Sequence, residues 1–301
     1  MRLFKTLDEL QSFVRVDDSI SLTSLAPFEP DALRKFIEPY LSAELMAVLE
    51  SGYTDDNLTS ELEALLPYVQ RPLARFTLLA AIPSLNLKTG ETGFTTVQTN
   101  TQVVASKDRT NDLKESLEAL AWDAIESLIA YLEENVTDFT EWEESEAYTM
   151  ATRNFINNAL EFDEIIDINR SRLVFMKLRK HMDYVEKKYI YPVISTEMAE
   201  DIIEELQEGS LSSNYQDIIE DLQRATAYLS FAEFKEDPKK AIRGNSYLSN
   251  IRQALYDTPA SFPLWAASDS YDEDHEDLMQ YENDNDSKKG VYVFGGYGLS
   301  R

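Results

Sequence analysis

The chain contains no cysteine, and only two histidines and nine glycines occur among its 301 residues. Without thiols, disulfide bonds, a cysteine nucleophile and thiolate metal sites are all excluded. Basic side chains are also scarce: 28 Lys and Arg stand against 55 Asp and Glu, for a formal net charge of −27. Because affinity for phosphates comes from Lys and Arg, this charge argues against nucleic-acid binding as the main task. The 43% of apolar residues is nevertheless enough for a folded core.

Long hydrophobic runs are missing as well. The most apolar stretch, residues 76–85, is interrupted by Pro83 and is about half as long as the roughly 20 residues of a membrane span. The N-terminal segment carries Asp8 and Glu9 where a signal peptide needs an apolar run. We therefore expect a soluble protein without membrane contact that is intracellular where it is made.

An internal repeat is the main feature that is present. A shift of 153 residues places residues 35–45 over residues 188–198, and a shift of 123 places residues 139–148 over residues 262–271. The repeated positions are Pro39, Ser42, Trp142 and Tyr148 in the first copy and Pro192, Ser195, Trp265 and Tyr271 in the second. Because the shared residues are not merely apolar positions at helical spacing, the pattern indicates a tandem duplication.

Each copy has the apolar periodicity of helices. We predict a mainly α fold of two tandem helical-bundle units from an internal duplication. The first unit covers residues 1–150, with a β-hairpin extension at about 85–97, where β-formers flank Gly90 and Gly93. A second, shorter helical repeat covers residues 151–286, and a flexible, Gly/Tyr-rich C-terminal tail covers residues 287–301.

Several helix boundaries follow from local signals. Thr6 and Glu9 have the spacing of a capping box. Pro39 should end a helix at about residues 36–38, and Ser42 should cap the next one. Pro67 and Pro72 should kink or break a helix over residues 58–82, whereas its counterpart at 213–233 should be continuous. A long helix is expected at 111–135, with a shortened partner at 247–256.

No residue pattern indicates catalysis, a cofactor or a metal, so we predict a protein that is not an enzyme. His181 is expected at the surface of a helix over residues 171–190. His275 lies in the acidic segment 269–286, which lacks the glycine and the ligand spacing of an EF-hand. The matched Trp, Ser and Tyr blocks are more typical of a core wedge than of a ligand box.

Two segments are candidate partner interfaces. The basic segment 170–188 is either an ordinary solvated helix face or a docking helix, for DNA or more readily for the acidic surface of a neighbouring subunit. The C-terminal tail contains a strand-like run that could add to a partner's sheet. The candidate interface residues are Arg170, Arg172, Lys177, Arg179 and Lys180 in the basic segment and Val291, Tyr292, Val293, Phe294 and Tyr297 in the tail.

The order of motifs resembles a known family. Residues 6–16, followed by a helix leading to residues 36–41, look like the start of the small helical head–tail connector proteins of tailed phages. The duplicated form is similar to an uncharacterised family of Bacteroidetes phages and prophages, whose pattern would include residues 171–175, residues 185–186 with 190–192, and the Trp-x-x-Ser-x-x-Tyr blocks. The simple connectors carry one unit, whereas this chain carries two.

The resemblance implies a virion structural protein, present in the host cytoplasm during assembly, that binds the portal and other neck or tail proteins without catalysis. It implies a ring of about a dozen copies through which DNA passes without specific binding. An acidic surface suits such a conduit because it repels phosphates. Another neck or tail-completion protein remains an alternative, and a cytoplasmic binding module or a carboxylate-dependent hydrolase is the alternative of a different class.

Overall fold

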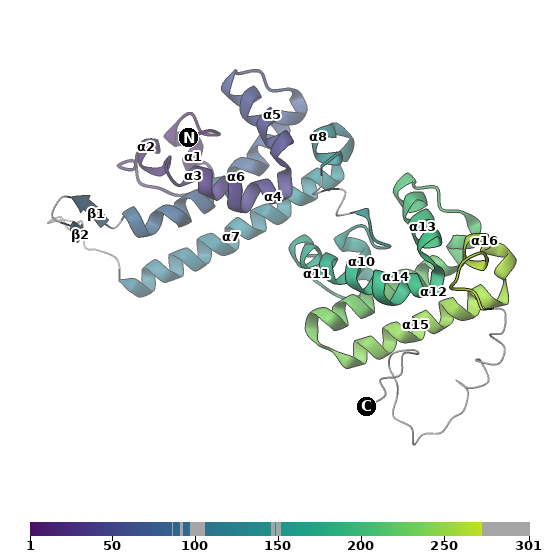
Figure 1. Cartoon of the computed structure of the whole chain (residues 1–301). Coiled ribbons are helices and arrows are strands. Elements are labelled where there is room, and N and C mark those ends of the chain that lie inside the picture. Colours follow the sequence, from purple (N-terminus) through teal and green to yellow (C-terminus); the bar gives the residue numbers. More distant parts are fainter. Residues whose placement is uncertain (86, 91–92, 97–105, 146–147, 149–151, 273–301) are drawn as a thin grey trace. The chain divides into compact units, whose positions relative to one another are not determined.

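A computed structural model describes residues 1–85, 87–90, 93–96, 106–145, 148 and 152–272. The chain divides into two compact units, Met1–Thr149 and Met150–Arg301, which are described separately (Figure 1). The described residues are mainly helical, which confirms the prediction of a mainly α protein.

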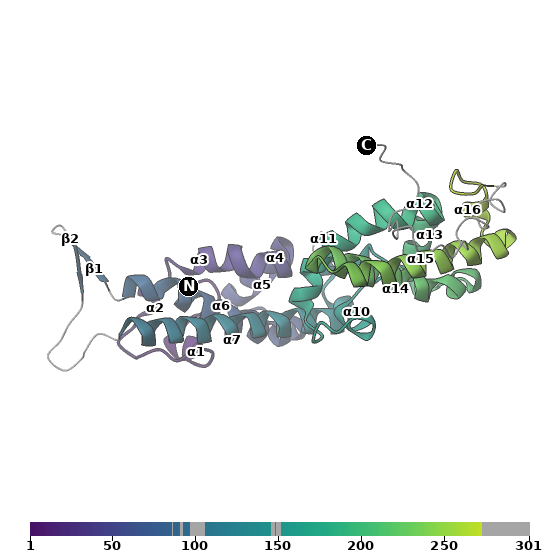
Figure 2. The same cartoon turned by 90° about the horizontal axis from the view of Figure 1, so that it is seen from below.

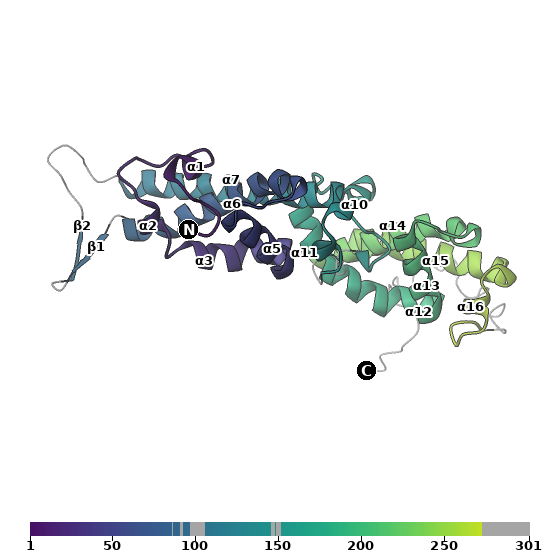
Figure 3. The same cartoon turned by 90° about the horizontal axis from the view of Figure 1, so that it is seen from above.

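The first unit packs short N-terminal helices against two long ones. Figures 2 and 3 show the long helices α6 and α7 running alongside each other. Its elements are α1 (Leu7–Gln11), α2 (Leu22–Leu25), α3 (Glu29–Ala32), η1 (Leu33–Ile37), α4 (Glu38–Leu41), α5 (Ala43–Thr54), α6 (Ser60–Leu85), β1 (Leu87–Gly90), β2 (Gly93–Thr96), α7 (Lys107–Glu134), η2 (Val136–Asp138) and α8 (Thr140–Glu143).

The second unit presents a similar order of elements without strands among its described residues. The helices α14 and α15 form its longest pair and pack along each other. Its elements are α10 (Ala159–Ile165), α11 (Arg172–Val185), η3 (Glu186–Ile190), α12 (Tyr191–Ile194), α13 (Thr196–Glu208), α14 (Ser213–Lys235), α15 (Pro238–Asp257), η4 (Pro259–Ser261) and α16 (Pro263–Ala266).

Aromatic side chains join the long helices of the first unit. The Phe36 and Phe76 rings stack with centroids 4.1 Å apart, and Trp122 from α7 meets the Phe76 ring edge-on at 5.2 Å. In the second unit, the corresponding helices approach so closely that a Cβ atom on Gly244 would lie 2.6 Å from Cγ of Leu229. Glycine is therefore needed where α15 crosses α14.

Both units turn the same proline corner, and the prediction that Pro39 ends the preceding helix is wrong. The turn before each proline is a π-helix, η1 or η3, in which Glu38 N–H donates to Leu33 O and Tyr191 N–H donates to Glu186 O. Proline lacks an N–H and its ring clashes with the carbonyl four residues earlier. The wider π-turn accommodates this clash, so the chain remains helical for one further turn, through α4 or α12.

Serine ends each corner in the same unusual conformation. Ser42 has φ 70° and ψ 153°, and Ser195 has φ 71° and ψ 158°, a region that favours glycine. The Ser42 hydroxyl accepts from Leu45 N–H at 3.2 Å, and the Ser195 hydroxyl accepts from Met198 N–H at 3.3 Å. The predicted serine caps are therefore confirmed. The Thr6 cap is confirmed too, because its hydroxyl accepts from Glu9 N–H.

Other boundaries differ from expectation. The helix α6 is unbroken although it contains Pro67 and Pro72, since tertiary packing against α7 compensates for the lost backbone bonds. The helix α7 begins at Lys107, where Ser106 caps it, and α15 begins at Pro238 rather than near residue 247. A proline in the first turn is well suited to start a helix. Within the region 85–97, β1 and β2 pair antiparallel, with Leu87 opposite Thr96 and Gly90 opposite Gly93.

Candidate functional site

The most unusual polar site in the described residues surrounds Glu186 at the start of η3. Its side chain is buried, and its carboxylate accepts from Phe155 N–H at 3.2 Å and from the Asn154 side-chain amide at 2.7 Å. Gln223, from α14, donates to Phe155 O at 3.0 Å. Glu186 and Gln223 therefore hold both polar groups of the Phe155 backbone and fasten the segment that opens the second unit.

The first unit contains a matching arrangement. Buried Glu29 accepts from Arg2 N–H, at 2.9 Å to one carboxylate oxygen and 2.7 Å to the other. Gln70, which the repeat aligns with Gln223, donates to Leu3 O at 2.6 Å. In both units a buried carboxylate and a glutamine thus hold the opening segment against the helices. We call these two sets of contacts the clasps.

The charge of Glu186, the buried acid in the clasp of the second unit, depends on pH. Burial raises the pKa of Glu186 to about 8, against the opposing effect of the N–H donors from Asn154 and Phe155, and the nearby Asp183 carboxylate raises it further. Asp183 is itself held by Asn154 at 3.0 Å and by an ion pair with Arg153. Glu186 is therefore mostly protonated at neutral pH.

Beside the first clasp, Glu9 behaves in the opposite way. Burial alone would raise its pKa, but hydrogen bonds from the Tyr53 hydroxyl, Lys5 N–H and the Gln70 amide together hold the pKa below its ordinary value. The Tyr53 hydroxyl lies 2.7 Å from one oxygen of the Glu9 carboxylate. Glu9 therefore remains ionised while it joins three elements of the unit.

A polar cavity of about 440 Å³ lies beside Glu186. Its lining includes the acidic residues Asp183, Glu200 and Glu204 and the basic residues Arg153 and Lys187. A carboxyl with a raised pKa at a cavity is a common feature of acid–base sites. Here, however, the Glu186 oxygens already accept bonds from Phe155 and Asn154, and this geometry favours a structural role.

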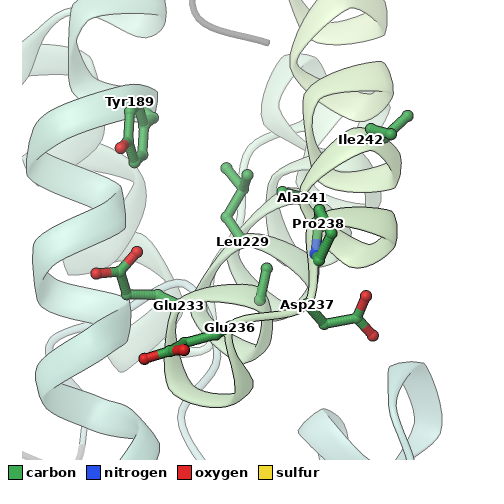
Figure 4. Close-up of a pocket in the computed structure, with 9 residues that line it drawn as sticks. Tyr189, Leu229, Glu233, Glu236, Asp237, Pro238, Ala241 and Ile242 are labelled. Carbon is green, nitrogen blue, oxygen red and sulfur yellow. The ribbon is translucent and has the colours of Figure 1, made fainter.

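A second cavity, of about 340 Å³, lies at the turn between α14 and α15 (Figure 4). Its surface is largely apolar, and its lining includes Leu229, Ala232, Pro238, Ala241, Ile242 and Tyr189. Three acidic residues complete the lining: Glu233, Glu236 and Asp237. We call this feature the apolar pocket.

The candidate residues of the basic segment do not form one uniform face. Arg170 is exposed and lies 3.8 Å from the Asp163 carboxylate. Lys177 and Lys180 are exposed, three residues apart on α11 and thus on one face of the helix. Arg172 and Arg179 are partly buried, and the Arg179 guanidinium lies over the Phe175 ring at 5.2 Å. Only part of the predicted basic face is therefore available to a partner.

The tryptophan blocks fasten the proline corners. Trp142 donates from Nε1 to Tyr40 O at 3.0 Å, and Trp265 donates to Val193 O at 2.9 Å. Their rings meet Tyr148 and Tyr271 at 4.9 and 5.0 Å. Because both indoles are buried, the prediction of a core wedge is confirmed. The matched prolines occupy the same place in both corners, one residue before the carbonyl that accepts the indole bond: Tyr40 follows Pro39, and Val193 follows Pro192.

The remaining predicted positions divide into two groups. His181 is partly buried rather than fully at the surface, and its ring meets Phe234 edge-on at 5.6 Å. Burial lowers its pKa, and Lys180 adds to this effect. His275 and the tail candidates Val291, Tyr292, Val293, Phe294 and Tyr297 lie outside the described residues.

Two features are absent from the described part of the chain. No group of three or more His, Cys, Asp or Glu there could hold a metal ion. No helix there has the length and apolar character needed to cross a membrane.

The clasps and the apolar pocket are absent from the sequence-based candidates. The identical Gln-Arg pair at residues 70–71 and 223–224 could have pointed to the clasps, because a repeated polar pair within an apolar stripe suggests a shared buried bond. The exposed Ile242 near the start of a polar helix is the one sequence signal for the pocket.

A family model matches parts of the chain. The family model described as "Family of unknown function (DUF6712)" matches residues 35–152 and 240–275, which together are just over half of the chain. No curated protein and no solved structure matches the chain.

Proposed function

We propose that this chain, which belongs to the family of unknown function DUF6712, is a virion structural protein of tailed phages. In this proposal it acts as a head–tail connector, or adaptor, that binds the portal and forms part of the DNA conduit. It would work through protein–protein contacts and self-association in a ring, without catalysis. Its location would be the virion, and the host cytoplasm during assembly.

The use of the buried polar groups is the observation that carries this proposal. Glu29, Glu186, Gln70 and Gln223 bind backbone atoms of their own unit, and both indoles do the same. These buried groups therefore stabilise the fold of their unit, and partner proteins would bind to surface residues instead. An acidic surface that repels phosphates is compatible with a DNA conduit.

A tandem duplication is part of the same proposal. Its support comes from the matched sequence blocks, from the nearly identical backbone angles of Ser42 and Ser195 and from the equivalent indole bonds to Tyr40 and Val193. An array of two units offers two similar surfaces, which suits a protein that contacts several neighbours. The hairpin β1–β2 extends from the first of these units.

Assembly with a portal protein tests the proposal. The full chain is mixed with a portal protein from the same genome, and the mixture is measured by negative-stain imaging and by mass in solution. We expect rings attached to portal particles. The charge-reversal variant K177E/K180E should weaken this binding at least tenfold, because those two side chains are exposed on one face of α11.

A matched control is the variant K107E/R109E. It makes the same charge change at exposed positions in the first turn of α7, where acidic residues favour a helix. Equal loss in both variants would show a general charge effect and contradict a docking role for α11. Absence of any complex between the unaltered chain and the portal would contradict the connector proposal.

A carboxylate-dependent hydrolase remains the competing proposal of another class. The position of Glu186, with its raised pKa, beside the 440 Å³ cavity favours it. Hydrolysis of ester, amide or glycoside probes that disappears in Glu186→Gln, but persists in Glu200→Gln, would support that alternative over the connector.

A further inference from the structure

The apolar pocket combines an apolar surface with acidic residues at one edge. Figure 4 shows Leu229, Ala241 and Pro238 around its centre, with Glu233 and Glu236 together along one side. Ile242 in its lining is 52% exposed. A partner that fits this surface would therefore carry apolar side chains next to positive charge.

Basic residues near the pocket do not neutralise this edge. Lys235 lies over the Phe234 ring, and Lys240 lies over the rings of Tyr228 and Phe231. None of these three rings lines the pocket, whereas Lys188 lies over the ring of Tyr189, which does. No ion pair joins a described basic residue to Glu233 or Glu236, so the acidic edge can still attract a positively charged partner.

One segment of the chain outside the described residues has the required chemistry. Residues 288–294 read Lys-Lys-Gly-Val-Tyr-Val-Phe, with two positive charges directly before an apolar run. In an extended conformation, side chains of such a run alternate between two faces. One face would present Val291 and Val293, and the other would present Tyr292 and Phe294.

The length of the intervening chain fits a contact within the same molecule. The described chain ends at Asp272, whose N–H donates to the Tyr256 hydroxyl near the end of α15. The pocket lies at the other end of α15, about 24 Å away at 1.5 Å per residue. The 16 residue steps from 272 to 288 can reach at most about 53 Å when fully extended, which is more than enough to span this distance.

We propose that residues 288–294 dock in the apolar pocket of their own chain, with Lys288 and Lys289 beside Glu233 and Glu236 and with one apolar face of the run against Leu229, Ala241 and Ile242. A linker that can span the distance raises the effective concentration of the tethered segment at the pocket. The contact within one chain is therefore favoured over a contact between copies. This inference does not rest on the proposed function.

The absence of cysteine makes cross-linking a direct test. The full chain carrying Ile242→Cys and Val293→Cys is oxidised at low micromolar concentration, and the products are separated by mass. We expect an internal disulfide without covalent dimers. The control pair is Ser249→Cys with Val293→Cys, since Ser249 is exposed on the same helix two turns further on, and its disulfide should form at least tenfold more slowly.

Charge and side-chain variants complete the test. E233K/E236K should slow the internal cross-link at least tenfold, whereas D217K/E220K, the same charge change near the start of α14, should leave its rate within about twofold. In the Ile242→Cys chain with the second cysteine placed at Gly290, two further variants replace Val291 and Val293, or Tyr292 and Phe294, by Ser. Because one face of the run contacts the pocket, one of these variants should slow the cross-link at least tenfold, and the other should leave its rate within about twofold.

Three results would overturn the inference. They are covalent dimers in place of the internal product, equal rates at positions 242 and 249, and a rate unaffected by E233K/E236K. None of these measurements depends on binding to a portal, so the failure of one proposal leaves the other standing.

Discussion

In the first unit, α6 carries three prolines and packs against the 28-residue helix α7, whereas in the second unit the proline-free α14 packs against the 20-residue helix α15. Around the corners, by contrast, the units agree: each has a π-turn, a proline, a serine at positive φ and a buried indole bonded to a backbone carbonyl. The proline corner is therefore the feature that the two units share, whereas the lengths and sequences of their long helices differ.

The clasps show how the same architecture is built with different electrostatics. The clasp of the second unit has a carboxyl whose pKa is raised by burial, to about 8. The clasp of the first unit adjoins Glu9, whose pKa is lowered by its hydrogen-bond donors despite burial. The two units should consequently respond differently to pH, and unfolding followed separately in each unit at several pH values tests this comparison.

Removal of a corner indole should have the largest effect. Trp142→Ala and Trp265→Ala should each lower the free energy of unfolding of their own unit by about 3–5 kcal/mol, because each leaves a cavity and an unpaired backbone carbonyl. Urea unfolding followed by circular dichroism measures this loss. Leu264→Ala, beside Trp265 but 40% exposed, is the control. An equal loss in both units from one substitution would contradict independent corners.

The pH dependence of the second unit should follow Glu186. An acid whose pKa is raised in the folded state binds its proton more tightly when the protein is folded. The contribution of Glu186 to the free energy of unfolding is therefore fully present below about pH 4.5 and is lost as the pH rises through about 8. We expect a decrease on the order of a few kcal/mol across this window. Glu186→Gln should remove most of it.

Urea unfolding at several pH values measures that dependence, with Glu200→Gln as the control, because Glu200 lines the same cavity but is exposed. A pH profile unchanged by Glu186→Gln would show that Glu186 ionises normally and is not buried as described.

A close helix crossing distinguishes the second unit from the first. Gly244→Ala should destabilise the second unit by about 1–3 kcal/mol, because the added Cβ would lie 2.6 Å from Leu229 Cγ and forces α15 away from α14. Adding Gly244→Ala to the Leu229→Ala variant should lower the free energy of unfolding by less than Gly244→Ala does in the unaltered chain, because the side chain that meets the new Cβ is shortened. Ser246→Ala, on the same helix but exposed, should change stability little. An equal effect of Gly244→Ala and Ser246→Ala would exclude the close crossing.

The serine caps should give the smallest and most nearly equal effects. Ser42→Ala and Ser195→Ala should each cost about 1 kcal/mol, since each removes an N-cap and leaves alanine at positive φ. Ser42→Gly and Ser195→Gly should cost less, because glycine adopts this conformation without strain. Thermal unfolding of the four variants makes the comparison. A glycine variant less stable than its alanine counterpart would contradict the positive φ.

Local signals allowed part of the fold to be predicted. The apolar periodicity predicted helices, Ser42 and Ser195 were identifiable as caps, and the tryptophan blocks were identifiable as core. The predictions of helix ends at prolines failed, because packing in the folded protein supports helices that the local sequence alone would interrupt. Pro39 does not end its helix because a π-turn accommodates it, and α6 continues through Pro67 and Pro72 because α7 supports it.

The candidate site was less predictable. The basic segment was visible as charge, but periodicity alone did not show that Arg179 packs on Phe175 while Lys177 and Lys180 remain exposed. The clasps join residues about 30 to 70 positions apart, such as Glu186 with Phe155 and Gln223 with Phe155. Contacts of that range leave little trace in one sequence.

By itself, the sequence determined the helical class, the repeated corner residues and the excess of acidic charge, because caps, periodicity and composition act within a few residues. Only the tertiary structure decided that Glu186 is buried and that an apolar pocket with an acidic edge lies beside α15. Burial and desolvation depend on every element packed around a group, and this surrounding is created only when distant segments of the chain come together.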